Sequence, residues 1–440
     1  MVVQIYLISF IYYHNPIFYN ITMLSKEIQD FVLNEAKDRF LRYVRVWTTS
    51  DENSNSFPSS ENQFELGKIL ADELKSLNVN ERFHDKSGYV YAYLQPSKGC
   101  ENAQHVGFIA HLDTSPAVNG KEVKPVIHKN YDGNAIKFAQ NDELSLTLRD
   151  SPQLEEYIGL DIITSQGDTL LGADDKAGIG EIMAACAAWQ KYPELKHGPI
   201  TICFFPDEEI GKGSEMIDLS KLPNVCYTLD GSEMGQLEIE CFDAWKVNLK
   251  FRGLNVHPGY AKNVMVNAIH IASRFISEIP EDQSPEHTEE REGFYHLSRL
   301  QGNEEEATAK LIIRDFNFES NNRRMEYIDI LKGFFEKRYL GLKIELEFEH
   351  QYQNMFNFLE NEHQIVDMAK KAIEAAGIEV KIHSIRGGTD GAHLSARGIP
   401  TPNIFAGGLL FHSRKEYIPT IALQKAAEVI INIADLWASL

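Results

Sequence analysis

The chain has 440 residues, of which 43% are apolar and 24% are charged, as in an ordinary globular protein. Collagen-like, low-complexity and disulfide-scaffold proteins are thereby excluded, and the length allows two or three domains. The chain carries 43 Lys and Arg against 64 Asp and Glu, a net charge of −21. Because this charge repels nucleic-acid phosphates and anionic membranes, we expect neither as a partner.

Cysteine usage indicates a reducing compartment. An odd number of thiols cannot all pair, and no CxxC spacing is present among Cys100, Cys186, Cys203, Cys226 and Cys241. Four of the five lie in segments that are predicted to be buried helix or strand, as in reduced cytosolic proteins. The sequence therefore predicts a cytoplasmic protein.

The first residues of the chain differ from the rest. Residues 1–25 contain no Asp, Glu, Lys or Arg, and Val2–Tyr13 is apolar enough to suggest a signal peptide or an anchor. However, a basic start and a small-residue cleavage site are both missing, and Pro16 interrupts the run before it could span a bilayer. We therefore interpret residues 1–22 as an N-terminal extension outside the fold, with Met23 as the working start.

Helices alternate with short apolar strands in two stretches of the chain, 23–240 and 352–440. In the first, helices are expected from Lys26 to about Val44, near 61–77 and at Ala177–Trp189, and strands at Tyr89–Leu94, Val106–Ala110, Ile200–Phe205 and Val225–Leu229. In the second, we expect helices at Glu362–Ala376 and Ile421–Trp437, with strands at Val380–Ser384 and Pro402–Phe405. This order predicts an α/β domain with a mixed, mostly parallel sheet flanked by helices.

The intervening residues, 241–351, have another pattern. The predicted order is strand, helix, strand, strand, helix, strand, at Trp245–Phe251, Val264–Ile279, Tyr295–Leu300, Ala309–Phe316, Arg324–Lys337 and Lys343–Glu349. This β-α-β-β-α-β order is that of a ferredoxin-like unit. We therefore predict that a small domain is inserted into the larger one.

Histidines and carboxylates gather at the predicted strand ends. His111 and Asp113 follow one strand and point the same way, because residues two apart in an extended chain share a face. Further acidic residues, and a second histidine after a glycine turn, follow the other apolar segments: Asp174, Asp175, Asp207, Glu208, Glu209, Asp230, Glu233 and His412. Ligands of open α/β sheets bind outside the carboxyl ends of the strands.

Each of these residues also has a plain structural explanation. A lone histidine at a strand end is more often hydrogen-bonded than metal-bound, and two aspartates at a helix start can cap the helix. Four or five strand ends that each supply a carboxylate or an imidazole are harder to explain in this way. Two histidines with several carboxylates form a ligand set for zinc or a similar divalent ion, with enough acids for two ions.

Seven sequence motifs extend this interpretation: IAHLDTSP, LLGADDKAGIGEI, FFPDEEIGKG, TLDGSEMG, RGLNVHPGYAKN, RGGTDGA and GGLLFHSRKEYIP. In their order along the chain and in their amino-acid sequences, these motifs resemble the peptidase T branch of the di-zinc exopeptidase family that also contains carboxypeptidase G. The similarity runs from about Lys26 to the C-terminus. It implies a zinc-exopeptidase-like fold and a metal-dependent aminopeptidase that releases the N-terminal residue from tripeptides.

The resemblance also implies a role for each site residue. One metal ion would be held by His111, Asp174 and Asp230 and the other by Asp174, Glu209 and His412, with Asp174 shared. Asp113 would orient the His111 ring. Glu208 would act as the general base that takes a proton from water and returns it to the leaving amine.

The inserted domain resembles the lid of this family. His257 would then hydrogen-bond the oxyanion of the transition state, and Asn263 would contact substrate. Arg386 could pair with the C-terminal carboxylate of the peptide, because its planar guanidinium suits a carboxylate. A structural salt bridge to Asp390 or a neighbour is the alternative for Arg386.

Several points stay open from the sequence. A carboxypeptidase or an N-acyl amino-acid deacylase on the same scaffold is the alternative enzyme, and a non-catalytic metal-binding protein is a further one. Zinc is the expected metal, although cobalt and manganese accept the same ligands. A short peptide is the expected partner, together with a possible homodimer through the lid domain.

Overall fold

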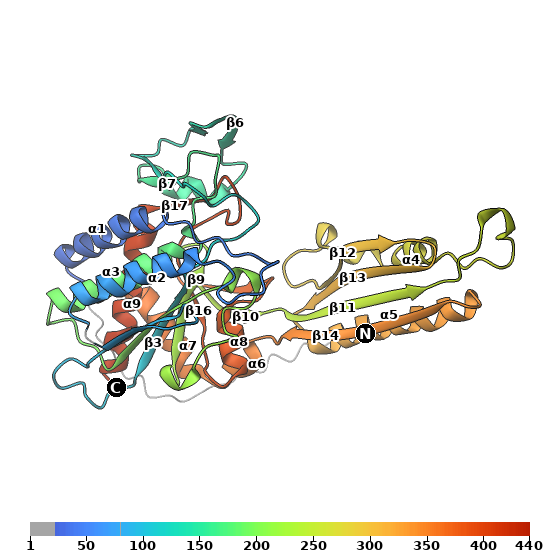
Figure 1. Cartoon of the computed structure of the whole chain (residues 1–440). Coiled ribbons are helices and arrows are strands. Elements are labelled where there is room, and N and C mark those ends of the chain that lie inside the picture. The colour runs from blue at the N-terminus through green and yellow to red at the C-terminus, as the bar shows by residue number, and fades with distance from the viewer. Residues whose placement is uncertain (1–22, 80) are drawn as a thin grey trace, which may run out of the picture.

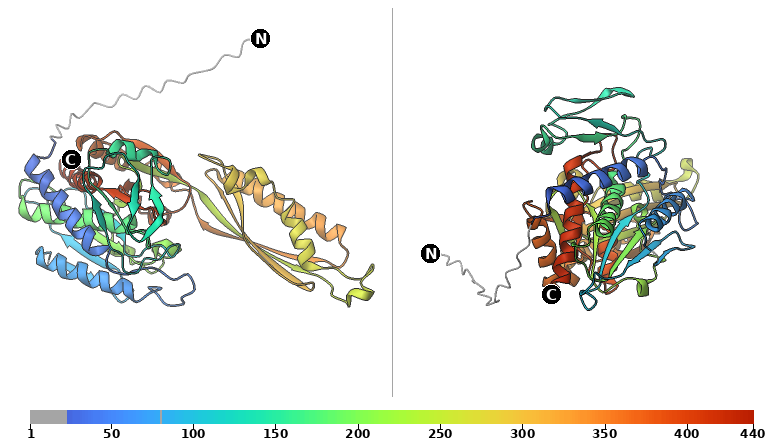
Figure 2. Two further views of the ribbon diagram at one scale, coloured as in Figure 1. Left: turned by 90° about the horizontal axis from the view of Figure 1, so that it is seen from above. Right: turned by 90° about the vertical axis from the view of Figure 1, so that its left-hand side faces the viewer.

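The computed structural model describes residues 23–79 and 81–440. The predicted N-terminal extension, residues 1–22, therefore lies outside the described residues. The molecule is elongated, with a large α/β domain from which a narrower unit projects (Figure 1). The two views of Figure 2 show this projection from above and from the end of the large domain.

The large domain is built on an eight-stranded mixed sheet. From one edge to the other its strands are β1 (Glu81–His84), β2 (Val90–Leu94), β8 (Ile200–Phe205), β3 (Val106–His111), β9 (Cys226–Gly231), β16 (Asn403–Phe405), β10 (Gln236–Cys241) and β15 (Lys381–Ile385). The central strands β8, β3, β9 and β16 run parallel, whereas β2 pairs antiparallel with β8, and β10 with β16. The predicted α/β class is therefore confirmed.

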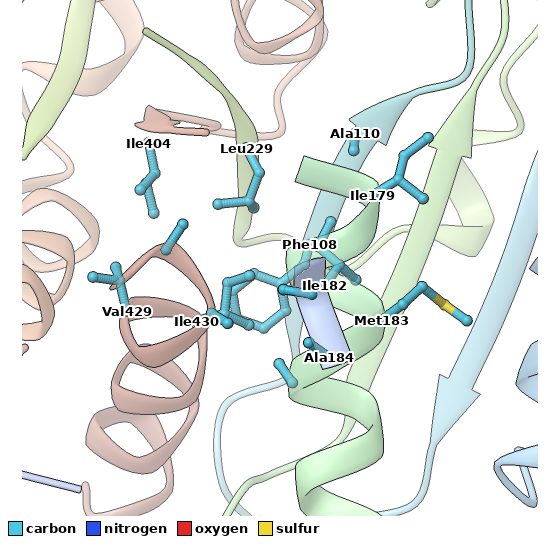
Figure 3. Close-up of a cluster of buried hydrophobic side chains, with 14 of the residues drawn as sticks. Phe108, Ala110, Ile179, Ile182, Met183, Ala184, Leu229, Ile404, Val429 and Ile430 are labelled. Atoms are coloured by element: carbon cyan, nitrogen blue, oxygen red, sulfur yellow. The ribbon is translucent and has the colours of Figure 1, made fainter. Parts of the chain in front are cut away.

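Helices cover the sheet because its central strands are apolar on both faces. They are α1 (Lys26–Tyr43), α2 (Asn62–Ser76), α3 (Ala173–Lys191), α6 (Phe356–Leu359), α7 (His363–Ala375), α8 (Asp390–Ala396) and α9 (Thr420–Ala438). In the core, Phe108 of β3 packs between Ile182 of α3 and Ile430 of α9 (Figure 3). Each such buried side chain contributes about 1.5–3 kcal/mol, so this core fixes β3 and α3 relative to each other.

A second unit is inserted between β10 and β15. It consists of β11 (Asp243–Arg252), α4 (Ala268–Ile276), β12 (Phe294–Gly302), β13 (Glu306–Asp315), α5 (Phe318–Arg338) and β14 (Lys343–Tyr352). Its antiparallel sheet has the order β12-β13-β11-β14, and the two helices pack on it around a core of its own. This is the β-α-β-β-α-β order expected from the sequence, and we call it the inserted domain; its predicted limits, 241 and 351, stay predictions.

The sequence patterns did not indicate a third, smaller lobe. It contains β4 (Val126–His128), β5 (Ile136–Phe138), β6 (Asn141–Leu146), β7 (Ile162–Thr164) and β17 (Tyr417–Pro419), in a three-stranded sheet and a hairpin. Most of these strands have three residues, which is too short for a hydrophobic alternation to appear. The hydrophobic core of the lobe includes Leu409 and Tyr417, which lie on either side of His412 in the sequence.

Within residues 23–79 and 81–440, no helix is long and apolar enough to cross a membrane.

Candidate active site

The site forms where parallel strands end together. His111 is the last residue of β3 and pairs in register with Phe205, the last residue of β8. The turn that carries Glu208 and Glu209 follows β8 directly, and Asp230 lies near the end of β9, on the other side of β3. Adjacent parallel strands thus bring their terminal side chains to one edge of the sheet, as expected.

Asp174 and Asp230 meet the buried ring of His111. The Nε2 atom of His111 lies 2.8 Å from Asp174 Oδ1 and 3.4 Å from Asp230 Oδ1. Asp174 stands at the start of α3, where its backbone departs from helical angles. These are the three side chains predicted for the first metal ion, and the structure brings them together.

His412 forms the second half of the cluster. Its Nε2 atom lies 3.0 Å from Asp174 Oδ2 and 2.9 Å from Glu209 Oε2. His412 lies exposed in the loop before β17 and has a left-handed backbone conformation with φ of 57°. These are the residues predicted for the second ion, and Asp174 contacts both histidines.

Asp113 joins His111 to the turn after β8. Its carboxylate oxygens accept hydrogen bonds from the backbone amides of Glu208, at 3.0 Å, and Glu209, at 3.2 Å. The Nδ1 atom of His111 lies 3.4 Å from Asp113 Oδ1 and 3.1 Å from the Asp113 carbonyl oxygen. Asp113 thus contacts the side of the ring opposite Nε2, where an orienting residue is expected.

Burial and mutual repulsion raise the pKa values of three carboxyl groups in the cluster, whereas contacts with His111 and His412 lower the pKa of Asp174 despite its burial. Burial is the main cause for Glu209 and Asp230, whose pKa values rise to about 8 and about 6. For Glu208, burial and the charge of Asp230 raise the pKa well above its usual range. Hydrogen bonds to Asp174 and Glu209 raise the pKa of His412 to about 11.

Three further residues support the cluster; Asp175 is among the acidic residues noted in the sequence, whereas the sequence patterns did not indicate Asn403 and Glu416. Each hydrogen-bonds the backbone of a predicted ligand from another part of the fold: Asp175 Oδ2 accepts from His111 N at 3.1 Å, Asn403 Oδ1 from Asp230 N at 3.0 Å, and Glu416 Oε1 from Asp174 N at 3.2 Å. Asp175 is itself fully buried and also accepts from Gly178 N. Their roles depend on contacts between residues distant in sequence, which spacing does not reveal.

Two cavities meet at Glu209 and His412. One of about 430 Å³ is lined by Glu208, Asp390 and residues of β14 such as His350 and Tyr352. The other, of about 400 Å³, is lined by residues 51–53 and 115–117. A short chain of residues could therefore extend to either side of the cluster.

The two inserted-domain residues predicted to contact substrate do not lie at the cluster. His257 and Asn263 are exposed and belong to the loop between β11 and α4. This loop lies at the end of the inserted domain away from the large domain (Figure 1). The ten residues of β11 separate this loop from the domain junction, a span of about 30 Å. The sequence could not indicate that the loop lies far from the cluster, because its position depends on the direction in which β11 runs.

Arg386 contacts the inserted domain instead of the cavities. Its guanidinium donates hydrogen bonds to the carbonyl oxygens of Thr288, Glu290 and Glu292, at 2.9–3.3 Å, and to the Thr288 hydroxyl. It also lies over the ring of Phe242. The alternative pairing with Asp390 is not found among the described residues, where Asp390 Oδ2 has no hydrogen-bond partner. Substrate binding by Arg386 stays a prediction.

The cluster fits metal ions. Glu209 Oε1 is buried and has no hydrogen-bond partner in the described part of the chain. Possible ligand atoms lie within 4.8 Å of one another in two groups, His111 with Asp174 and Glu209, and His111 with Asp175 and Asp230. Nitrogen and oxygen ligands of this kind suit divalent ions, whose charge would offset the carboxylates. His111, Asp174, Asp230, Glu209 and His412 would hold them.

Comparison with known proteins gives the family. The pattern of Peptidase family M20/M25/M40 matches residues 170–435. Peptidase T of Clostridium acetobutylicum is 45% identical over 92% of this chain and 100% of its own length. The chain belongs to peptidase family M20/M25/M40. This confirms the predicted family resemblance.

Solved structures agree on the fold of this family member. An aminopeptidase PepT from Bacillus cereus superposes with a TM-score of 0.72 at 24% identity, covering 93% of this chain and 99% of that one. A dinuclear metal-binding M20 peptidase from Bacillus subtilis superposes at 0.62 with 13% identity, over 94% and 99%. The family and the ligand cluster together support two metal ions in this M20 chain.

Proposed function

We propose that this chain is a metal-dependent aminopeptidase that releases the N-terminal residue from tripeptides. The similarity to Peptidase T over 92% of the chain supports the substrate class. The observation that carries the chemistry is the Asp174 carboxylate, which contacts His111 with one oxygen and His412 with the other.

The ions, most simply zinc, would supply a water of lowered pKa and would polarise the scissile carbonyl. Glu208 lies beside Glu209 but is outside the two histidine-carboxylate groups, and it lines the larger cavity. A carboxylate in this place, next to a metal-bound water, can take its proton and return it to the leaving amine. We therefore assign Glu208 as the general base.

Asp113 supports this step without contacting substrate. It holds the backbone of Glu208 and Glu209 and contacts the His111 ring, so one carboxylate fixes the base and two ligands relative to one another. The loss of such a supporting contact typically lowers metal affinity or activity by about 10- to 100-fold.

The first test is metal removal. Dialysis against a strong chelator should abolish hydrolysis of a tripeptide, and zinc, cobalt or manganese should restore it, with two ions bound per chain by elemental analysis. Activity in protein shown to be metal-free would contradict the proposal. The ion that gives full activity at the lowest free concentration identifies the preferred metal.

A substrate panel separates the alternative enzymes. Rates are compared on a tripeptide, a dipeptide and an N-acetylated tripeptide, with release of the N-terminal residue followed by chromatography. An aminopeptidase requires the free amine, so acetylation should abolish cleavage. An N-acyl deacylase would release acetate instead, and a carboxypeptidase would release the C-terminal residue.

We also propose that the protein acts in the cytoplasm and associates through the inserted domain. All five cysteines are free, which suits a reducing compartment. The loop that carries His257 and Asn263 exposes Leu254, Tyr260 and Val264, and Tyr260 is 80% exposed. A second chain that covered this loop would bury these apolar side chains.

A further inference from the structure

The carboxylate of Glu416 binds four consecutive backbone amides. Its Oε2 atom accepts hydrogen bonds from the amides of Leu171, at 2.7 Å, and Gly172, at 2.9 Å. Its Oε1 atom accepts from Ala173, at 2.6 Å, and Asp174, at 3.2 Å. The side chain is 1% exposed, so water does not replace these contacts.

These four amides form the turn that leads into α3. Gly172 has a left-handed φ of 82°, and the helix begins irregularly because Asp174 and Asp175 depart from helical angles. Each buried amide left without an acceptor would cost about 1–3 kcal/mol. The shape of this turn, and with it the position of Asp174, therefore depends on an anion at this point.

Glu416 also belongs to the segment that carries the other half of the cluster. It follows His412 by four residues and directly precedes Tyr417 of β17, which is hydrogen-bonded to Leu409. One side chain thus ties the His412 loop to the Asp174 turn. Glu416 thus joins the two segments whose side chains meet in the cluster, where His412 Nε2 lies 3.0 Å from Asp174 Oδ2.

We propose that Glu416 is a positioning residue for the metal cluster, which fixes Asp174 relative to His412 and thereby sets the affinity for metal ions. This inference rests on the proposed metal-dependent function. An anion is suited to the place, because the start of a helix and successive backbone amides both favour negative charge.

The chemistry of the side chain determines which variant is informative. Glu416→Gln keeps the size but replaces one acceptor oxygen by an NH₂ group, which would face two amide donors. Glu416→Asp keeps the charge but is one methylene shorter. A matched control is Glu181→Gln, because Glu181 is a fully buried carboxylate of the same helix α3 that accepts no hydrogen bond from the described residues.

The experiment measures zinc binding alone, by competition with a chromophoric chelator, on metal-free full-length protein. We expect Glu416→Gln to raise the dissociation constants by about 10- to 100-fold and Glu416→Asp to raise them less, with Glu181→Gln within about threefold of the unaltered protein. The visible spectrum of the cobalt-loaded protein should change in Glu416→Gln and not in Glu181→Gln, because it reports ligand geometry.

Thermal melting of the metal-free variants separates positioning from stability. A Glu416→Gln protein that melts earlier but keeps its zinc affinity and cobalt spectrum would overturn the inference and leave Glu416 as a structural cap. If Glu416→Gln does not fold, unchanged zinc affinity in Glu416→Asp would overturn it equally. Failure of the unaltered protein to bind two ions would instead contradict the proposed function.

Discussion

Asp174 lies between two histidines, with Oδ1 at 2.8 Å from His111 Nε2 and Oδ2 at 3.0 Å from His412 Nε2. Both oxygens are therefore used, which distinguishes Asp174 from Glu209 and Asp230. Glu209 contacts only His412 among the two histidines, and Asp230 only His111.

This relationship predicts the effect of replacing a single oxygen. Asp174→Asn should lower bound metal from two ions to at most one per chain, because an amide nitrogen is no metal ligand. Metal content is measured by elemental analysis after equilibration with excess zinc. Asp218→Asn, at an exposed carboxylate on a short surface turn, is the control and should keep both ions. Two tightly bound ions in Asp174→Asn would contradict the shared-ligand assignment.

The two adjacent glutamates should fail in different ways. Glu208→Ala should keep both metal ions and lose about 10²- to 10⁴-fold in kcat, as when a general base is removed. Glu209→Ala should lose metal, because its Oε2 atom lies 2.9 Å from His412 Nε2. Metal content and steady-state rates on a tripeptide check both. The reverse pattern would show that base and ligand are exchanged at this turn.

The sequence indicated the ligands because local chain geometry places them. His111 ends β3, and Glu209 follows β8, so a strand prediction alone directs both side chains to one edge of the sheet. The supporting residues could not be predicted in this way. Glu416 acts on a turn 242 residues away from it in the chain, and only the tertiary fold brings the two segments together.

The inserted domain shows the other limit of sequence analysis. Its element order follows from local hydrophobic patterns, but the place of its loops relative to the cluster depends on the direction in which β11 leaves the large domain. Motif resemblance therefore identified His257 and Asn263 without indicating that the structure keeps them apart from His111.

A variant of Arg386 can show whether this residue binds the substrate or only holds the inserted domain against the large domain. Arg386→Ala removes the hydrogen bonds to the carbonyls of Thr288, Glu290 and Glu292, so we expect a loss of about 2–3 kcal/mol in unfolding free energy. The preference for a tripeptide over its C-terminal amide should stay unchanged. Arg323→Ala, at an exposed arginine of α5, is the control. A clear loss of the acid-to-amide preference would restore the role predicted from the sequence.

Metal affinity should increase with pH. Contacts with Asp174 and Glu209 raise the pKa of His412 to about 11, and the neighbouring carboxylates raise that of His111 against the effect of burial. His412 is therefore protonated at neutral pH without metal and must release a proton when metal binds. The apparent association constant should rise about tenfold per pH unit for each proton released. Chelator competition between about pH 6 and pH 8 measures this, and a pH-independent constant would contradict it.

His257 gives the last prediction, because its place in the structure makes the oxyanion role depend on movement or on a second chain. The exposed ring contacts only its own loop in the described structure, where Nδ1 accepts a hydrogen bond from Gly259 N at 3.1 Å. If His257 reaches the cluster only in the transition state, the loss should fall on kcat and not on KM. We expect His257→Ala to keep both metals and its melting temperature, and to lower kcat by about 10²- to 10³-fold.

Mixed chains then show which subunit supplies His257. If the inserted domain of a partner supplies it, a hybrid of His257→Ala and Glu208→Ala chains contains one complete site, although neither variant is active alone. An equal mixture should regain about a quarter of full activity, because half of the dimers are hybrids and each has one complete site. Absence of recovery despite measured subunit exchange would show that each chain uses its own His257 through closure of the inserted domain. A normal kcat in His257→Ala would contradict the oxyanion role, because catalysis would then not require the His257 side chain.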